Sequence, residues 1–301
     1  MVAAQEQTRA GPVLLLDAFS LFFRAFYALP GMNTTRGEPT SAVYGLSVLL
    51  LKLLREQRPR GLAFAMDVGP TFRHVDYQPY KATRNAAPSS LGAQMPRLTQ
   101  LLRVLDVPAL GSPGFEADDV LATLCRELTA RGEAPMVVTG DHDCLQLARG
   151  AARVMIVSRG AVKAEIYDEL AIRMRFGLRP DQLPEYRALV GDPSDNIPGV
   201  PGIGPRTGSA LIGRFGDVAT LLARLEEVTP PRTREAIRAV QGKLPLYADI
   251  SRLRDQVPLP ADPHWKALGA DARDRLRAFF EELEFKSLLP RIDAAFGVGP
   301  P

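Results

Sequence analysis

Short apolar runs alternate with longer amphipathic segments along the first two-thirds of the chain. Runs that predict buried strands occur at 13–17 (VLLLD), 61–67 (GLAFAMD), 135–141 (PMVVTGD) and 152–158 (ARVMIVS). Segments whose apolar residues recur at helical spacing predict helices over 20–29, 41–57, 96–106 and 117–132. Strands that alternate with helices indicate an α/β fold with a doubly wound, mainly parallel sheet that carries helices on both faces.

The pattern changes near residue 180, after which only helical periodicity remains. A last amphipathic helix is expected over 271–285. We therefore divide the chain into four parts: a disordered tail at 1–12, an α/β domain at 13–180, an all-helical region at 181–290 and a second tail at 291–301.

Composition narrows the class of protein. Among 301 residues, 46% are hydrophobic and 24% are charged, as in ordinary globular proteins. The two cysteines, Cys125 and Cys144, have no zinc-binding or disulfide spacing, which argues for a reducing compartment. The polar N-terminus leads into only four apolar residues, too few for a signal peptide or a membrane span. We expect a soluble, cytoplasmic protein.

Charge is distributed unevenly along the chain. The formal net charge of +3 is by itself weak evidence for a nucleic-acid partner. Residues 70–96, however, form a long excursion without periodicity, and such excursions are usually functional or disordered. Between Thr71 and Arg103 a single acid, Asp76, accompanies five cations: Arg73, Lys81, Arg84, Arg97 and Arg103. This distribution indicates a polyanion held over an acidic pocket.

Three of the predicted strands end in an aspartate, namely Asp17, Asp67 and Asp141, and Asp143 follows the last of these. The carboxyl ends of parallel strands meet at one edge of a sheet, where open α/β sheets bind ligands. Carboxylates this close repel and raise one another's pKa unless a cation lies between them. Oxygen donors without His or Cys favour Mg²⁺ or Mn²⁺ over zinc. We therefore expect a divalent-metal site at this edge.

Two further acidic segments extend the set. FEADDV places Glu116, Asp118 and Asp119 at the start of a helix, where capping is the alternative to metal binding but needs only one acid. GDPSDN adds Asp192 and Asp195, and aspartates in such a segment are often only turn formers.

The segment GVPGIGPRTG at 199–208 has the glycine spacing of a tight turn between helices. Gly199, Gly202 and Gly204 allow a sharp turn, and amides at the start of the next helix can meet a phosphate. A helix connection without a ligand is the alternative. The spacing is similar to that of a helix-hairpin-helix element, which grips the DNA backbone without reading its sequence. We expect this element at about 197–225.

Taken in order, these segments resemble the 5′ nuclease (flap endonuclease-like) family, especially the N-terminal 5′–3′ exonuclease domain of bacterial DNA polymerase I and its free-standing relatives. The matching segments are LLLDAFSLFFRAFYAL, RGEPTSAVYG, FRHVDYQPYKATR, GFEADDVLATL, VVTGDHDCLQL, YRALVGDPSDNIPGVPGIGPRTG and LEFKSLL. The resemblance implies a PIN-like α/β fold followed by a helix-hairpin-helix region. It also implies a structure-specific 5′–3′ exonuclease or 5′-flap endonuclease of DNA replication, including Okazaki fragment or primer processing, and of DNA repair.

The resemblance implies where two metal ions would bind. The first site would consist of Asp17, Asp67, Glu116 and Asp118. The second would consist of Asp141, Asp143, Asp192 and Asp195, with Asp119 close by. The expected ions are Mg²⁺, with Mn²⁺ as the alternative, and two-metal hydrolysis needs no side chain as nucleophile.

The resemblance also implies contacts with DNA. Residues 71–97 would form a helical arch whose phosphate and base contacts are Arg73, Tyr80, Lys81 and Arg84. At the hairpin the DNA contacts would be Gly199, Gly202, Gly204, Arg206 and Thr207, and the backbone carbonyls of Val200 and Ile203 would hold a K⁺ ion. The catalytic residues would be Lys81, Arg84, Asp118 and Asp141, the first two by offering positive charge to the scissile phosphate.

The implied partner is DNA with 5′ ends, flaps or nicks, with an RNA primer in an RNA/DNA hybrid as a further candidate. A monomer in the bacterial cytoplasm, associated with the nucleoid and not with a membrane, is expected. The sequence departs from the family where His142 replaces a common Lys and where Pro205-Arg206 replaces Glu-Lys. Two alternatives stay open: a non-catalytic protein that binds DNA structures, and a PIN-type metal-dependent ribonuclease.

Overall fold

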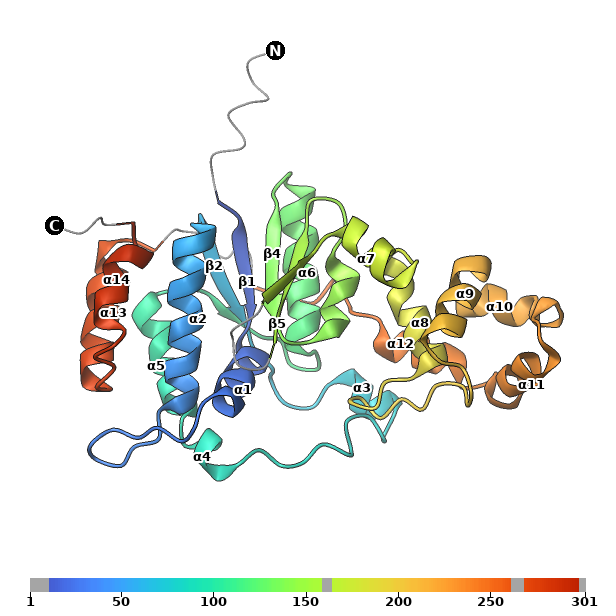
Figure 1. Ribbon diagram of the computed structural model, residues 1–301, viewed down its shortest axis with the longest axis horizontal. Helices are drawn as coiled ribbons and strands as arrows, with labels where there is room; N and C mark the ends of the chain where they lie inside the picture. The colour runs from blue at the N-terminus through green and yellow to red at the C-terminus, as the bar shows by residue number, and fades with distance from the viewer. Residues whose placement is uncertain (1–10, 159–163, 261–267, 298–301) are drawn as a thin grey trace, which may run out of the picture.

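A six-stranded sheet lies at the centre of the computed structural model, which describes residues 11–158, 164–260 and 268–297 (Figure 1). The strands follow the order β3-β2-β1-β4-β5-β6. Their bounds are β1 (Val13–Asp17), β2 (Gly61–Ala65), β3 (Ala109–Leu110), β4 (Pro135–Thr139), β5 (Arg153–Val157) and β6 (Ala164–Tyr167). All neighbours pair in parallel except β5 and β6, which are antiparallel. The mainly parallel sheet is thus confirmed.

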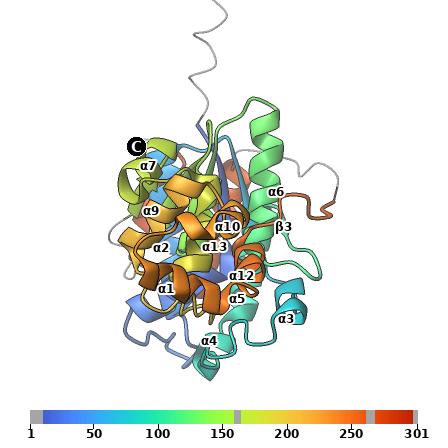
Figure 2. The same ribbon diagram turned by 90° about the vertical axis from the view of Figure 1, so that its right-hand side faces the viewer.

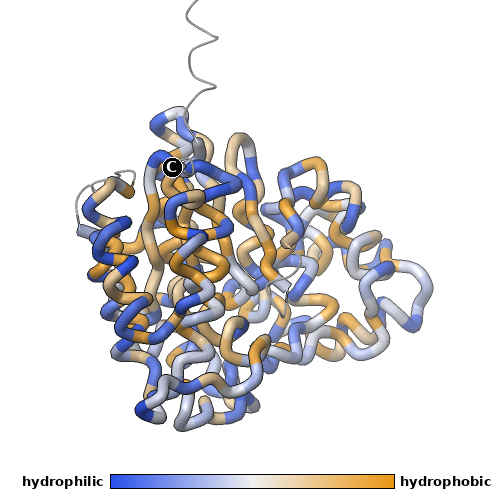
Figure 3. The backbone as a smooth tube through the Cα atoms, turned by 60° about the vertical axis from the view of Figure 1, so that its left-hand side comes forward, coloured by the Kyte–Doolittle hydropathy of each residue, from blue (hydrophilic) through white to orange (hydrophobic). Residues whose placement is uncertain are grey.

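Helices cover both faces of this sheet because the central strands are buried on both sides. Leu14 and Leu16 of β1 face one core, whereas Val13 and Leu15 face the other. The first core is covered by α1 (Ala18–Ala28), α2 (Ser41–Gln57), α5 (Met95–Leu105), α13 (Ala270–Glu282) and α14 (Leu289–Ala295). The second is covered by α6 (Ala117–Ala130), the 3-10 helix η1 (His142–Leu147) and α7 (Glu169–Phe176). Figure 3 shows many orange segments in the interior of the molecule and blue segments along its outer turns.

The predicted tail at 291–301 is wrong in its first half. Residues up to Ala295 belong to α14, and Ile292 is buried in the first core because the helix packs against α2 and α13. The rest of that tail beyond Gly297 lies outside the described residues, as does most of the predicted N-terminal tail at 1–12.

The last part of the chain forms a helical lobe with its own apolar core (Figures 1 and 2). It contains η2 (Pro180–Gln182), α8 (Leu183–Val190), α9 (Pro205–Phe215), α10 (Val218–Ala223), η3 (Leu225–Glu227), α11 (Pro231–Val240) and α12 (Leu244–Ser251). In Figure 1 the lobe extends from one side of the sheet, while α13 and α14 return to the opposite side. No helix within the described ranges is long and apolar enough to cross a membrane.

The basic excursion connects β2 to α5 along one edge of the molecule (Figure 1). Two short helices, α3 (Phe72–Asp76) and α4 (Ser89–Gly92), interrupt it. Its far end is anchored by the buried Gln94, whose Oε1 accepts a hydrogen bond from the backbone N–H of Ala42 at 2.8 Å. The predicted arch limit of residue 97 therefore falls inside α5.

Candidate active site

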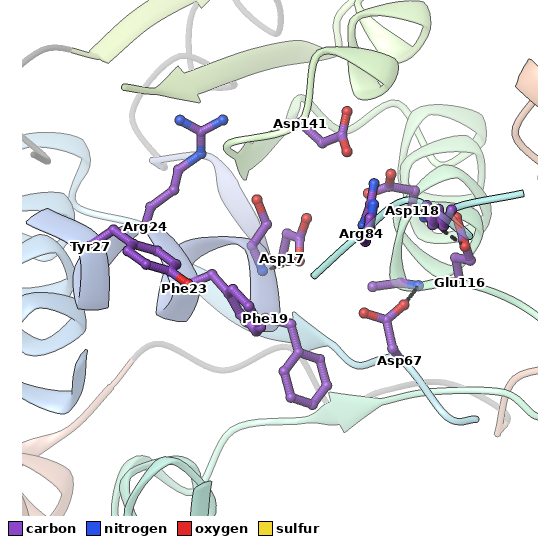
Figure 4. Close-up of a pocket in the computed structure, with 13 residues that line it drawn as sticks. Asp17, Phe19, Phe23, Arg24, Tyr27, Asp67, Arg84, Glu116, Asp118 and Asp141 are labelled. Carbon is purple, nitrogen blue, oxygen red and sulfur yellow. Dashed lines mark hydrogen bonds and ion pairs between the residues drawn. The ribbon is translucent and has the colours of Figure 1, made fainter. Parts of the chain in front are cut away.

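A cavity of about 650 Å³ opens at the carboxyl edge of the sheet, between β1, β2 and β4 (Figure 4). It is lined by five of the nine predicted carboxylates, Asp17, Asp67, Glu116, Asp118 and Asp141. Helix α1 forms the other side of the cavity with Phe19, Phe23, Arg24 and Tyr27, and the excursion contributes Lys81 and Arg84. The structure therefore brings strand-end acids and excursion cations into one pocket.

Asp17 is fixed by the junction of β1 and α1. As the N-cap of α1 it accepts a hydrogen bond from Ser20 N at 3.0 Å, and its second oxygen accepts one from Thr139 Oγ1 at 2.7 Å. Burial, reinforced by the charges of Asp67 and Asp141, raises the pKa of Asp17 to about 7 despite these hydrogen bonds. A buried carboxylate under this repulsion favours a nearby cation.

Two more acids of the cavity, Glu116 and Asp118, lie at the start of α6. Glu116 is the N-cap, and Asp118 is the second residue of the helix. Asp67 is joined to the same turn because its carboxylate accepts a hydrogen bond from Ala117 N at 2.9 Å. Burial and the charges of neighbouring carboxylates raise the pKa of Asp118 well above its usual range, and its Oδ1 accepts a weak hydrogen bond from Cys144 Sγ at 3.2 Å.

The remaining acids meet around Arg187 on α8, next to Asp141. Arg187 contacts Asp143 at 2.5 Å and also pairs with Asp192. Burial raises the pKa of Asp143 to about 8, although the Arg187 charge opposes the shift. Asp195 pairs with Arg84 at 2.9 Å. The two predicted ligand sets are therefore adjacent, with cationic side chains between their members.

Within the described residues, no group of three or more His, Cys, Asp or Glu side chains is arranged so that it could hold a metal ion. Cations hold the acids in other pairings: Lys81 contacts Glu116 at 2.7 Å, and Arg84 and Arg187 contact the second set. The chemistry of the donors nevertheless fits a hard divalent cation, because carboxylate oxygens are the ligands that such ions prefer. Burial and mutual repulsion raise the pKa values of Asp17 and Asp118, and a bound cation would offset this repulsion.

Three predicted site residues have other partners in the structure. Arg73 is 1% exposed and makes a bidentate ion pair with Asp119 at 2.7 and 2.8 Å, so its predicted contact with DNA is wrong. Asp119 is completely buried, which excludes it as a ligand facing the cavity. Tyr80 is also buried, and its hydroxyl donates a hydrogen bond to Glu116 Oε2 at 3.0 Å. Tyr80 therefore orients Glu116 and is not available to a base.

The glycine-rich segment forms the turn between α8 and α9. Gly199 has a φ of +68°, and a Cβ there would lie 2.5 Å from the nitrogen of Gly191, so this position requires glycine. Gly202, Gly204 and Arg206 are exposed, and Thr207 is half-buried. The side chains of Val200 and Ile203 are buried, and the Val200 carbonyl already accepts a hydrogen bond from Ile203 N at 3.0 Å.

Sequence reasoning did not find several residues that build the site. Arg187 lies on α8, and Asp192 follows two residues after the end of this helix. A spacing of five residues is not a helical pairing signal, so the sequence does not distinguish Arg187 from a surface arginine. Phe19, Phe23 and Tyr27 recur every four residues along α1, which places them on one face. That spacing predicts that the three side chains share one face of α1, but not whether this face packs in the core or lines a cavity.

The sequence of the chain is similar to that of known nuclease domains. Residues 12–177 match the family described as "5′-3′ exonuclease, N-terminal resolvase-like domain", and residues 178–275 match "5′-3′ exonuclease, C-terminal SAM fold". The chain is 41% identical over 281 residues to the thermostable DNA polymerase I of Thermus thermophilus. The matched region covers 93% of this chain and 33% of that protein. The chain thus spans about a third of the length of such curated relatives.

Two solved structures have a similar fold at low sequence identity. One is the flap endonuclease of bacteriophage T5 in a complex with DNA and metal ions, with a TM-score of 0.64, 18% identity and coverage of 94% of this chain and 99% of that one. The other is the catalytic core of Rad2 in complex with DNA substrate, with a TM-score of 0.63, 18% identity and coverage of 95% and 92%. The arrangement of sheet and helical lobe is therefore the flap endonuclease fold.

Proposed function

Because the chain belongs to the 5′–3′ exonuclease family, we propose that it is a divalent-metal-dependent nuclease that hydrolyses DNA at 5′ ends and 5′ flaps. The observation that carries the proposal is the cavity at the carboxyl edge of the sheet, where five carboxylates meet cations of the basic excursion. A phosphodiester needs both features, since carboxylates hold the metal and cations receive the phosphate charge.

The carboxylates would form two ligand sets. Asp17, Asp67, Glu116 and Asp118 would hold one ion, and Asp141, Asp143, Asp192 and Asp195 would hold another. Oxygen donors favour Mg²⁺, with Mn²⁺ as the alternative. When bound, such ions supply an activated water and stabilise the charge that develops on the phosphate.

The side chains around the acids have distinct tasks. Thr139 fixes one oxygen of Asp17, and Tyr80 fixes one oxygen of Glu116. Lys81 and Arg84 pair with carboxylates in the structure, and we expect both to turn toward the scissile phosphate when DNA enters. Their exchange of partners would let the excursion 71–97 act as the arch over the cavity.

The α/β part, predicted as 13–180, would cut the strand, and the helical part, predicted as 181–290, would hold the duplex behind the cut. At the hairpin, the exposed Arg206 and the backbone near Gly202 and Gly204 are suited to phosphate contacts. A K⁺ ion on the Val200 and Ile203 carbonyls would be part of that contact.

The biological setting follows from the polymerase relatives and is also a proposal. We place the activity in replication and repair in a bacterial cytoplasm, on DNA flaps, nicks and primer-bearing RNA/DNA hybrids, with the protein acting as a monomer.

The test is incubation with 5′-labelled flap, nicked and blunt DNA, with and without Mg²⁺ or Mn²⁺. We expect cleavage near the flap junction only with the divalent ion, and loss of cleavage with retained binding in Asp118→Asn. Binding without hydrolysis under every condition would indicate a non-catalytic DNA-structure-binding protein. Preference for single-stranded RNA over flap DNA would indicate a PIN-type ribonuclease.

A further inference from the structure

A second cavity, of about 590 Å³, lies beside the catalytic one, between α1, η1, α7 and α8. The two cavities share Arg24, Arg84 and Asp141, so a strand that leaves one can enter the other. The second cavity is also bounded by Val190 and Gly191, where α8 ends before the hairpin turn. It therefore lies on the path from the cut to the helical lobe.

The lining of this cavity contains more cations than acids. Four arginines accompany two acids, Asp141 and Asp192, and His142 adds an imidazole whose pKa is lowered by burial and by the charge of Arg175. Of the arginines, Arg187 is paired with both Asp143 and Asp192, and Arg84 is paired with Asp195. Arg24 donates a hydrogen bond to the carbonyl of Gly140, which helps to fix the position of the guanidinium. The four arginines outnumber the two acids of the lining, and this excess favours an anion at the arginines that other acids do not hold.

Of the arginines that line this cavity, Arg175 on α7 is the best placed to bind an anion. Its guanidinium lies over the rings of Tyr167 and Phe176, 5.4 and 5.6 Å from the ring centroids, and it contacts the Tyr167 hydroxyl. The contact with Tyr167 uses Nη1, so the Nε and Nη2 donors of the planar guanidinium are left for a phosphate. Its carboxylate neighbour, Glu165, is 3.6 Å away and 70% exposed, so this pair contributes little.

We propose that Arg175, together with Arg24 and His142, binds a phosphate of the DNA strand on the 3′ side of the cleaved bond. The 3′ side follows from the direction in which the cavity extends, because it runs from Arg84 and Asp141, which it shares with the catalytic cavity, to the end of α8, next to the hairpin that would hold the retained duplex. The wall formed by Phe176 and Tyr186, whose ring centroids are 5.9 Å apart, is suited to the adjoining sugar. This inference rests on the proposed nuclease function.

The chain offers a matched control on the same helix. Arg173 and Arg175 have similarly exposed side chains, at 52% and 47%, and each has a glutamate neighbour, but Arg173 does not line the cavity. Arg175→Gln and Arg173→Gln therefore remove the same charge from α7, one inside the proposed subsite and one outside it.

The experiment measures binding of a fluorescent 5′-flap DNA by anisotropy in EDTA, across a salt series. We expect Arg175→Gln to weaken binding about tenfold and to lower the salt slope by about one, and Arg173→Gln to change binding less than twofold. Single methylphosphonates, which remove one phosphate charge, are then placed along the strand. At the contacted phosphate, on the 3′ side of the cut, wild type and Arg175→Gln should bind the modified DNA equally.

Equal binding by the two variants would overturn the subsite. The subsite would also be overturned if the losses of binding free energy caused by Arg175→Gln and by each methylphosphonate were fully additive. If the two losses were instead non-additive at a phosphate on the 5′ side of the cut, the strand assignment would be overturned. Cleavage of the same flap by wild type in Mg²⁺ is scored separately. A failure of the nuclease proposal is thereby distinguished from a failure of the Arg175 contact.

Discussion

Replacing Arg73 by methionine tests whether this side chain holds the fold together or binds DNA. Its guanidinium is buried against Asp119 and also donates to the carbonyls of Ile250 at 2.8 Å and Arg252 at 3.1 Å. Asp119 in turn accepts the backbone N–H of Arg254 at 2.8 Å. One buried ion pair thus joins the excursion, the start of α6 and the segment after α12.

The expected loss of stability follows from these contacts. Removing one partner of a buried ion pair costs about 3–5 kcal/mol, because the other charge stays buried without compensation. The two carbonyls that lose their donor add to the effect, but the terms are not independent. We expect Arg73→Met to lower the free energy of unfolding by about 4 kcal/mol, out of the roughly 5–15 kcal/mol typical of a protein. The melting temperature should fall by roughly 10 °C.

The assay is urea unfolding followed by circular dichroism, for Arg73→Met, Asp119→Leu and the double variant. Because each single change leaves an uncompensated charge, the double variant should be less destabilised than the sum of the two, by about 3 kcal/mol. The reasoning is refuted if Arg73→Met melts within about 2 °C of wild type while flap binding weakens tenfold. That result would return Arg73 to the DNA interface.

Three further predictions concern the cavity and the hairpin. Lys81→Ala and Arg84→Ala should each slow single-turnover cleavage by about 10²-fold with little change in melting temperature; rates equal to wild type would remove the arch cations from the mechanism. Gly199→Ala should destabilise the protein by about 2 kcal/mol more than Gly202→Ala in urea unfolding, because both positions have a positive φ but only the first lacks space for a Cβ; equal losses would contradict the close approach. In EDTA, the free energy of unfolding should fall as pH rises from about 4 to 8, because the raised pKa of Asp17, about 7, means that the folded chain binds its proton more tightly than the unfolded chain. Mg²⁺ at pH 8 should restore stability, and Asp17→Asn should flatten the slope; an unchanged slope in that variant would exclude Asp17 as its source.

Much of the sheet could be predicted because its signals are local. Strand β1 and helix α2 have the predicted bounds, since an uninterrupted apolar run and a helical period each reflect burial along one element. Strands β3 and β6 lack such a signal: β3 has two residues, and β6 has a single buried residue, Tyr167. Their pairing is set by neighbouring strands and not by their own pattern.

The candidate site likewise has a part that local sequence signals predict and a part that they do not. The convergence of Asp17, Asp67 and Asp141 follows from strand direction alone, and the structure places all three on one cavity. The direction in which each cationic side chain of the basic excursion points depends instead on contacts with segments that are far away in the sequence. Arg73 turns inward because carbonyls some 180 residues later in the chain receive it, which no local spacing reveals.

The central claim is that the carboxylates of the cavity support metal-dependent cleavage of DNA. The most direct measurement is single-turnover cleavage of a 5′-flap DNA in Mg²⁺ by wild type and by Asp141→Asn, with Asp271→Asn on the surface of α13 as the matched control. We predict a loss of about 10²-fold or more in Asp141→Asn, flap binding within threefold of wild type, and no change in the control. Cleavage by Asp141→Asn at the wild-type rate would contradict the account.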